Sequence, residues 1–90
     1  MDPNPQTNPQ TKPMQERLKE SISILKQLNE LGVHKTNAAY KELSEHFNEW
    51  IRGGDSWSGD IEFPRYNRIA QVSLPIKLGR TATCNFLVKR

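Results

Sequence analysis

The chain has 90 residues, of which 34% are hydrophobic, and its formal net charge at pH 7 is +3. A chain of this length forms one domain with a thin core, because it buries only about 60–65% of the surface that its unfolded form exposes. We expect no transmembrane span, since no run of about 18 apolar residues is present, and no signal peptide, since residues 1–13 lack an apolar stretch. The single cysteine also favours a cytoplasmic or nuclear location, because small secreted domains usually depend on disulfides.

Residues 1–13 are expected to form an extended or disordered polar arm. They contain four of the six prolines, together with Asn, Gln and Thr, and they have no aromatic or branched aliphatic side chain. Such a segment cannot bury enough apolar surface to fold by itself. The folded domain is therefore predicted to span residues 14–90.

Two amphipathic helices are predicted at the start of this domain. The first spans residues 14–31 and ends at Gly32, and its apolar residues are spaced by three and four: Met14, Leu18, Ile22, Leu25, Leu28 and Leu31. The second spans residues 37–52 with Thr36 as its N-cap, and its apolar stripe is Ala39, Tyr40, Leu43, Phe47, Trp50 and Ile51. The short link favours an antiparallel helical hairpin. We expect both stripes to face the core, and any surplus apolar surface to be an interface.

Strands are predicted at residues 61–63, 69–78 and 82–89. The last two alternate apolar and polar residues with a period of two, and Pro64 limits the first to an edge. A three-residue loop at 79–81 would pair Leu74 with Phe86, which keeps the apolar residues of both strands on one face. The predicted fold class is α+β: an N-terminal antiparallel helical hairpin packed on a C-terminal antiparallel β-hairpin or small three-stranded sheet.

The basic residues gather in the C-terminal third of the chain. Residues 63–90 contain six Lys or Arg and no acidic residue, whereas residues 14–51 contain five Lys or Arg and six Asp or Glu. A one-sided positive field attracts phosphate backbones or acidic protein surfaces, although the same charges also serve to keep strand edges apart. The candidate contact residues for a partner protein or nucleic acid are Trp57, Arg65, Tyr66, Arg68, Lys77, Arg80, Lys89 and Arg90.

Trp57 is included because it lies in a loop rich in Ser, Gly and Asp, where periodicity gives no reason for an indole. Interface hot spots are enriched in Trp, Tyr and Arg. The alternative is that Trp57 folds back as a lid over the seam between helices and sheet.

No chemical motif points to catalysis. His34, His46 and Cys84 do not have the clustered spacing of a metal site, and the Ser/Gly/Asp run at 55–60 is ordinary turn chemistry. The glycines match no phosphate-binding loop. We therefore expect no catalytic residue, no metal, no cofactor and no small-molecule substrate, and we expect Cys84 to be a small buried hydrophobe.

A short motif gives one resemblance. The segment Ser58–Pro64, continued by Asn67-Arg68-Ile69 and Leu74-Pro75, resembles short uncharacterised basic proteins of large eukaryotic DNA viruses. The resemblance covers roughly the last third of the chain. It implies no activity, but it implies a virion or assembly role in which a small module with a polar arm lies between larger subunits.

Two functions are compatible with these patterns. The first is a non-enzymatic structural or assembly protein, such as a minor virion (capsid) component, that binds larger partner proteins through its basic β region and its N-terminal arm. The alternative is an accessory nucleic-acid-binding protein that uses the basic C-terminal third. The outward strand face offers no aromatic platform and the helices are neutral to acidic, so the first function is favoured.

Overall fold

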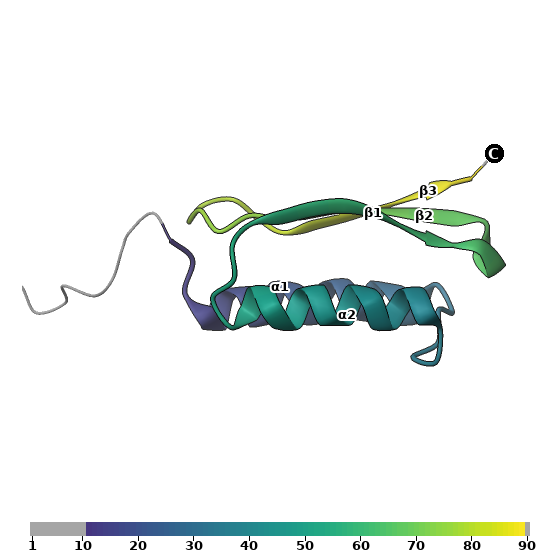
Figure 1. Ribbon diagram of the computed structural model, residues 1–90, viewed down its shortest axis with the longest axis horizontal. Coiled ribbons are helices and arrows are strands. Elements are labelled where there is room, and N and C mark those ends of the chain that lie inside the picture. The colour runs from purple at the N-terminus through teal and green to yellow at the C-terminus, as the bar shows by residue number, and fades with distance from the viewer. Residues whose placement is uncertain (1–10, 90) are drawn as a thin grey trace, which may run out of the picture.

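The computed structural model describes residues 11–89, which form two helices beneath one three-stranded antiparallel sheet (Figure 1). The elements in chain order are α1 (Met14–Glu30), α2 (Ala38–Ile51), β1 (Trp57–Phe63), the 3-10 turn η1 (Pro64–Tyr66), β2 (Arg68–Leu74) and β3 (Thr83–Val88). The strands follow one another in the order β1-β2-β3. The expected α+β class, with a helical pair and a small sheet, is confirmed.

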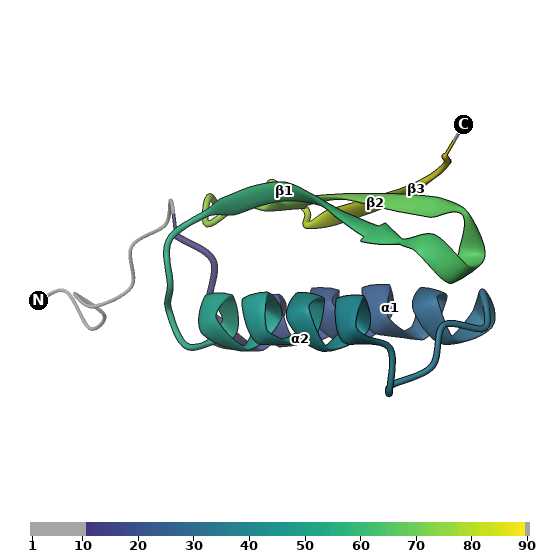
Figure 2. The ribbon, with the colours of Figure 1, turned by 45° about the vertical axis from the view of Figure 1, so that its right-hand side comes forward.

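The two helices cover one face of the sheet only. Figure 2 shows α1 and α2 side by side below the strands, while no layer of the described chain lies over the opposite face. The described residues include no helix with the length and apolar character needed to cross a membrane. The fold is thus an open two-layer arrangement with a single core between the layers.

The core is built mainly from α2 and the helix-facing side of β1 and β2. Its most completely buried large side chains include Trp50 and Phe47 from α2, Phe63 from β1 and Leu74 from β2. The apolar stripe predicted for α2 is buried at Tyr40, Leu43, Phe47 and Trp50. Helix amphipathicity therefore oriented α2 as expected.

The orientation predicted for α1 is correct for Leu28, which is buried, and for Leu25, which packs against the core, but it is wrong for the first half of the helix. Its buried residues are Arg17, Ser21, Ile24 and Leu28, whereas Met14, Leu18 and Ile22 are exposed. The buried set has spacings of four, three and four, so it lies on one helix face just as the expected stripe does. The two polar members have internal partners, since Arg17 Nη1 donates to the Trp50 carbonyl at 2.7 Å and Ser21 Oγ donates to the Leu18 carbonyl at 2.8 Å.

The pairing of β2 with β3 also differs from the expected register. Ala70 faces Phe86 and Val72 faces Cys84, so residues 75–82 connect the strands in place of a three-residue loop. Pro75 explains the early end of β2, because proline has no N–H to donate to the ladder. The shift from the expected register is four residues, an even number, so the same side chains still face the helices.

Strand β1 is longer than expected, and it includes Trp57. It begins at residue 57 and pairs along its whole length with β2, from Trp57 opposite Leu74 to Phe63 opposite Arg68. Trp57 is thus a strand residue, on the same side of β1 as the buried Ile61 and Phe63.

The described N-terminal residues join the β2–β3 connection. Thr11 forms an isolated antiparallel bridge with Lys77, and the Lys12 N–H donates to the Ile76 carbonyl at 2.8 Å. The last part of the expected arm therefore contacts the folded body, while residues 1–10 lie outside the described residues.

The N-cap of α2 is Asn37 and not the expected Thr36. The Asn37 side chain accepts hydrogen bonds from the backbone N–H groups of Ala39 at 2.8 Å and Tyr40 at 3.4 Å. The Asn37 N–H donates to the His34 carbonyl, which closes a turn around Thr36 and moves the cap one residue along the chain.

This cap gives a direct stability test. We expect Asn37→Ala to lower the free energy of unfolding by about 1 kcal/mol, because two N–H groups at the start of α2 lose their acceptor. Thr36→Ala is the matched control and should change it by less than about 0.5 kcal/mol. Urea denaturation followed by circular dichroism measures both values, and a larger loss at Thr36 would contradict the assignment.

Candidate functional site

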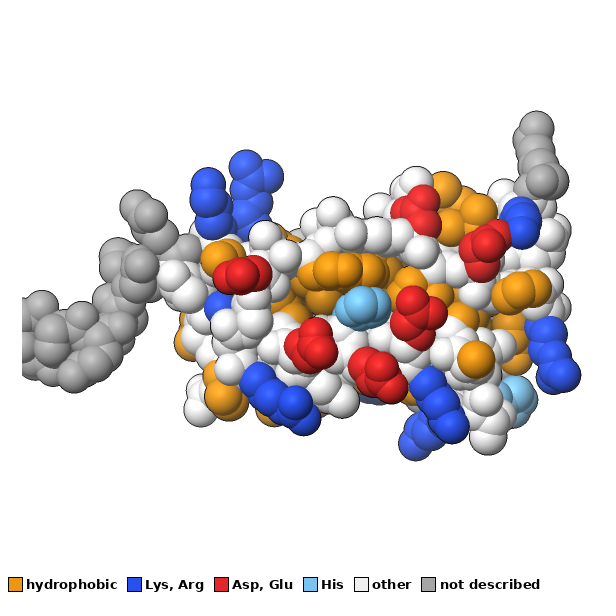
Figure 3. Space-filling view, in the orientation of Figure 1, with side chains coloured by type: hydrophobic (Ala, Val, Ile, Leu, Met, Phe, Trp, Pro, Cys, Tyr) orange, Lys and Arg blue, Asp and Glu red, His pale blue; other side chains and the backbone are white. Residues whose placement is uncertain are grey.

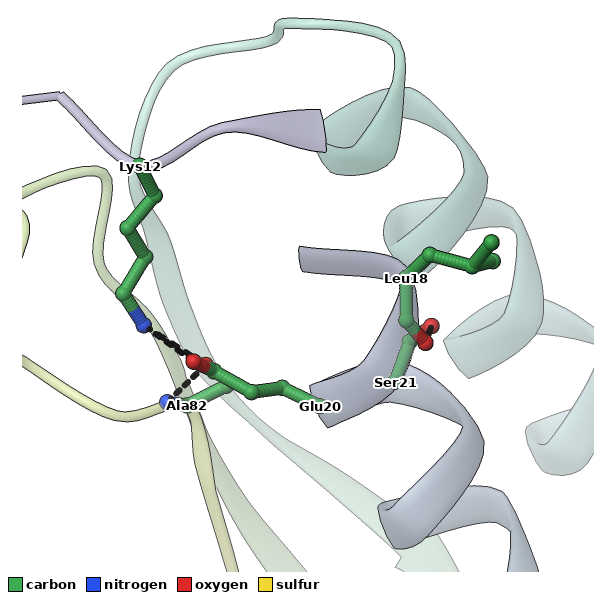
Figure 4. Close-up of polar contacts among 5 residues, drawn as sticks. All are labelled: Lys12, Leu18, Glu20, Ser21 and Ala82. Atoms are coloured by element: carbon green, nitrogen blue, oxygen red, sulfur yellow. Dashed lines mark hydrogen bonds and ion pairs between the residues drawn. The ribbon is translucent and has the colours of Figure 1, made fainter. Parts of the chain in front are cut away.

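A buried ion pair near the start of α1 is joined by hydrogen bonding to the distant β2–β3 connection (Figure 4). Lys12 Nζ lies 2.6 Å and 2.7 Å from the two carboxylate oxygens of Glu20, and the Ala82 N–H donates to Glu20 Oε1 at 2.6 Å. The Lys12 side chain is 0% exposed and that of Glu20 is 13% exposed. Glu20 thus links the N-terminal residues, α1 and the β2–β3 connection through one carboxylate.

A second cation lies close to this pair. Lys12 Nζ is 5.7 Å and Arg17 Cζ is 5.8 Å from the centroid of the Trp50 ring. Arg17 also donates to the carbonyl oxygens of Trp50 and Gly54 near the end of α2. Guanidinium and ammonium groups are attracted to the face of an indole, most strongly when water is excluded. The cluster therefore stabilises the contact between α1 and the C-terminal end of α2.

The expected basic surface is divided between two ends of the molecule. Arg65, Arg68 and Lys89 lie where η1, β2 and β3 meet, whereas Lys77 and Arg80 lie in the β2–β3 connection. Strand β2 separates the two groups and has seven residues, so at about 3.3 Å per residue they are roughly 20 Å apart.

The two basic groups also differ in their partners. Lys89 pairs with Glu62 of β1, and both side chains are exposed. No other Lys or Arg among residues 65–89 forms an ion pair with a carboxylate of the described chain. Arg90 lies outside the described residues.

An acidic surface lies along α2 and β1, on the side shown in Figure 3. Acidic side chains cross the middle of this view, with basic ones around its ends and lower margin. The exposed acidic residues of these two elements are Glu42, Glu45, Glu49, Asp60 and Glu62. A nucleic acid that followed the sheet from one basic group to the other would therefore pass close to carboxylates.

Trp57 takes part in an intramolecular stack. Its ring lies on His46 of α2, with centroids 4.0 Å apart and planes inclined by 16°. Gly59 makes room for the indole, because a Cβ at that position would lie 2.8 Å from it. Trp57 is half-buried, so it covers the seam between α2 and β1, in the arrangement of the lid alternative.

Tyr66 also makes an internal contact. Its hydroxyl donates to the Gly32 carbonyl at 2.7 Å, which connects η1 to the turn after α1. Among the candidate contact residues of the described chain, three are exposed and have no side-chain hydrogen bond or ion pair within it, namely Arg65, Lys77 and Arg80. The structure thus brings together only part of the predicted set.

The surface hollow near the start of α2 does not gather reactive side chains of one kind. An open hollow of about 690 Å³ between the start of α2 and η1 is lined by both acidic and basic side chains, among them Glu42, Glu62 and Arg65. Residues 11–89 contain no group of three or more His, Cys, Asp or Glu side chains that would suit a metal ion. Burial raises the pKa of the Cys84 thiol from 9.0 to about 11, which makes it a poor nucleophile at neutral pH.

The sequence prediction missed an exposed apolar row on α1. Met14 is 60%, Leu18 45% and Ile22 53% exposed, and the three are spaced by four residues on one helix face. We call this row the α1 stripe. Figure 4 shows the Leu18 side chain directed away from the Lys12–Glu20 pair. The sequence signal was present, but the spacing of three and four assigned these residues to the core.

Comparisons with known protein families, with curated proteins and with solved structures found no match. Any proposal about function must rest on the surfaces of this chain.

The buried ion pair leads to a stability prediction. Glu20→Gln should lower the free energy of unfolding by about 3 kcal/mol, because it leaves the buried Lys12 ammonium without its countercharge. The exposed pair supplies the control, since Glu62→Gln removes the partner of Lys89 and should change stability by about 1 kcal/mol or less. Urea unfolding of the three proteins measures this difference, and equal effects would refute the importance of the buried pair.

Cys84 gives a prediction about reactivity. At pH 8 the folded protein should react with iodoacetamide roughly 100-fold more slowly than the urea-unfolded chain, because a thiol with a pKa near 11 in place of 9.0 is far less ionised. The unfolded thiol ionises first as the pH rises, so this group's contribution to stability is present below pH 9.0 and is lost toward about pH 11. Mass spectrometry measures the rates, with Cys84→Ser as the unreactive control, and equal rates would contradict the burial of the thiol.

Proposed function

We propose that the protein is a non-enzymatic assembly module that binds a larger partner protein through the α1 stripe. The observation that carries this proposal is the contiguous exposure of Met14, Leu18 and Ile22 on one helix face. Single exposed apolar residues are common on soluble proteins, whereas contiguous apolar patches mark interaction sites. In a chain with a thin core, leaving three large apolar side chains in water forgoes stability that a partner would restore.

The charges beside the stripe indicate the chemistry of the partner. Lys19 and Lys26 are exposed on α1, and they flank Ile22 at spacings of three and four residues, which places them next to it on the helix surface. A partner that receives this face needs an apolar groove for the stripe and carboxylates at its rim for the two lysines. Docking a helix face into such a groove is a common mode of recognition.

This proposal keeps the expected assembly role but moves the contact surface. The contact lies on the outer face of the helices, and not on the basic β region. A virion role stays a prediction from the resemblance alone, and the proposal does not depend on it. The two side chains best suited to nucleophilic chemistry are used in packing, since His46 stacks on Trp57 and burial raises the pKa of Cys84.

Nucleic-acid binding has weaker support. Backbone recognition requires several cations along one track, whereas the cations here lie in two groups at opposite ends of β2, beside an acidic surface. The C-terminal third is basic in sequence, but folding disperses its charge.

The experiment uses the full chain with a photo-crosslinking residue in place of Leu18. The matched control carries the same residue in place of Lys41, which is exposed on α2. The protein captured from Leu18 in the native source is then purified, and its affinity for the unlabelled chain is measured by isothermal titration. We expect Leu18→Ser/Ile22→Ser to weaken binding by about 30-fold or more, because truncating a central contact typically costs more than 1 kcal/mol.

Lys77→Ala/Arg80→Ala should leave this affinity within about 3-fold, because these residues lie outside the proposed interface. If this variant loses binding while Leu18→Ser/Ile22→Ser does not, the contact surface lies on the basic β region and not on the α1 stripe. Titration with DNA and RNA at about 50 mM salt tests the alternative function, and tight, salt-sensitive binding there would favour it over assembly.

A further inference from the structure

β3 is an edge strand, and one row of its backbone groups bonds to no other part of residues 11–89. The Lys89 N–H donates to the Asn67 carbonyl of the β2 side at 2.9 Å, and Asn85 faces Gln71 in the ladder. Because bonding alternates along an antiparallel strand, the odd-numbered residues of β3 bond to β2. The N–H and C=O groups of Cys84, Phe86 and Val88 therefore point to the free edge, along which the described chain places no further strand.

The two edges of the sheet differ in their protection against pairing. By the same alternation, the outward backbone groups of β1 include those of Asp60 and Glu62. Charged residues on an edge strand prevent it from pairing with another chain. The sequence of β3, TCNFLV, contains no charge, no proline and no glycine, and its Leu87 and Val88 are 44% and 59% exposed. β3 is thus an edge without the usual protection.

We propose that β3 pairs with β3 of a second copy of this chain, antiparallel about a two-fold axis at Phe86, to form one continuous six-stranded sheet. The outward residues are symmetric about this position, so Phe86 faces its equivalent and Cys84 of each copy faces Val88 of the other. Each of these facing pairs exchanges two backbone hydrogen bonds, giving about six across the interface. An isologous contact of this kind closes as a dimer and does not propagate.

The side chains of β3 suit this self-pairing. Those of Cys84, Phe86 and Val88 lie on the helix-facing side of the strand, so apolar groups of both copies meet there. Since β3 has no charged residue, the pairing brings no like charges together. The same pairing at β1 would bring the carboxylates of Asp60 and Glu62 of two copies close together, and such contacts repel.

A hollow beside the free edge has room for the added strand. It has a volume of about 320 Å³, lies between α1 and β3, and is lined by residues that include Ser23, Gln27, Ala82 and Cys84. The inward side chains of a strand added to β3 would lie over this hollow, whose lining is uncharged except for Glu20, and that carboxylate is already paired with Lys12. The β3–β3 interface is small compared with the interfaces of typical stable dimers, so we expect a dissociation constant on the order of 1–100 μM.

The β3 edge and the α1 stripe are different surfaces, so this inference does not depend on the proposed function. Sedimentation equilibrium of the full chain from about 1 μM to 500 μM tests it. We expect a monomer–dimer equilibrium that Val88→Pro weakens at least 10-fold, because proline removes one outward N–H and leaves the β2–β3 ladder unchanged. Asp60→Pro is the matched control, since it removes an outward N–H from the opposite edge and should leave the dimer intact.

A cross-link tests the register directly. Val88→Cys should give a disulfide-linked dimer with the natural Cys84 under mild oxidation, because facing Cα atoms about 5.5 Å apart lie within disulfide range. Cys84→Ser/Val88→Cys should not be linked, since the two introduced thiols would lie about 13 Å apart along the paired strands. The cross-linking test checks the β3–β3 pairing even if the Val88→Pro variant does not fold.

Three results would overturn the inference. They are a monomer at every concentration, a dimer that Asp60→Pro or Leu18→Ser/Ile22→Ser abolishes, and an absence of the Cys84-dependent cross-link. The last two would assign self-association to another surface. If β3 binds a strand of another protein but never a second copy, the protein stays a monomer at every concentration, which is the first of these results.

Discussion

The carboxylate of Glu20 is the constraint on which the rest of the structure depends. A charge removed from water is tolerated only when it is paired and hydrogen-bonded, and Glu20 meets this condition by accepting from both Lys12 and the Ala82 backbone. To reach these partners, α1 must turn Glu20 toward the β2–β3 connection and Arg17 toward the end of α2. That rotation leaves Met14, Leu18 and Ile22 on the outside. The exposed apolar row is therefore a consequence of how the polar residues are satisfied.

The sequence predicted the fold class, the order of the elements and the inward side of α2 and of both hairpin strands. These features depend on local periodicity, as in the spacing of Leu43, Phe47 and Trp50. The rotation of α1 was not predictable in this way, because two faces of the helix have similar spacing and the choice depends on distant partners of Arg17 and Glu20. The register of β3 was missed for a related reason. Residues beyond Pro75 bond to the N-terminal segment, and not to the opposing strand.

The surface cannot be described by net charge alone. The positive balance of the chain hides an acidic side on α2 and β1, two separate basic ends, and two apolar regions, which are the α1 stripe with its flanking lysines and the uncharged β3 edge. Association through uncharged regions is governed mainly by apolar burial and backbone bonding. Pairing at the β3 edge would then vary little with salt, whereas binding at the α1 stripe would weaken moderately as its two flanking lysines are screened. The spatial arrangement of the charges, and not their sum, decides which kind of partner fits.

The contact between Glu20 and Ala82 spans 62 positions of the chain, and this span bears on how the protein folds. During synthesis, α1 leaves the ribosome long before Ala82 does, so the Glu20 carboxylate stays hydrated until Ala82 has also emerged. Closing so long a loop has an entropic cost that precedes any gain from the contact. Neither the helical pair nor the hairpin has its full set of internal partners alone. The nascent chain is therefore expected to acquire its native packing in one cooperative step, which begins only after Ala82 has emerged from the ribosome.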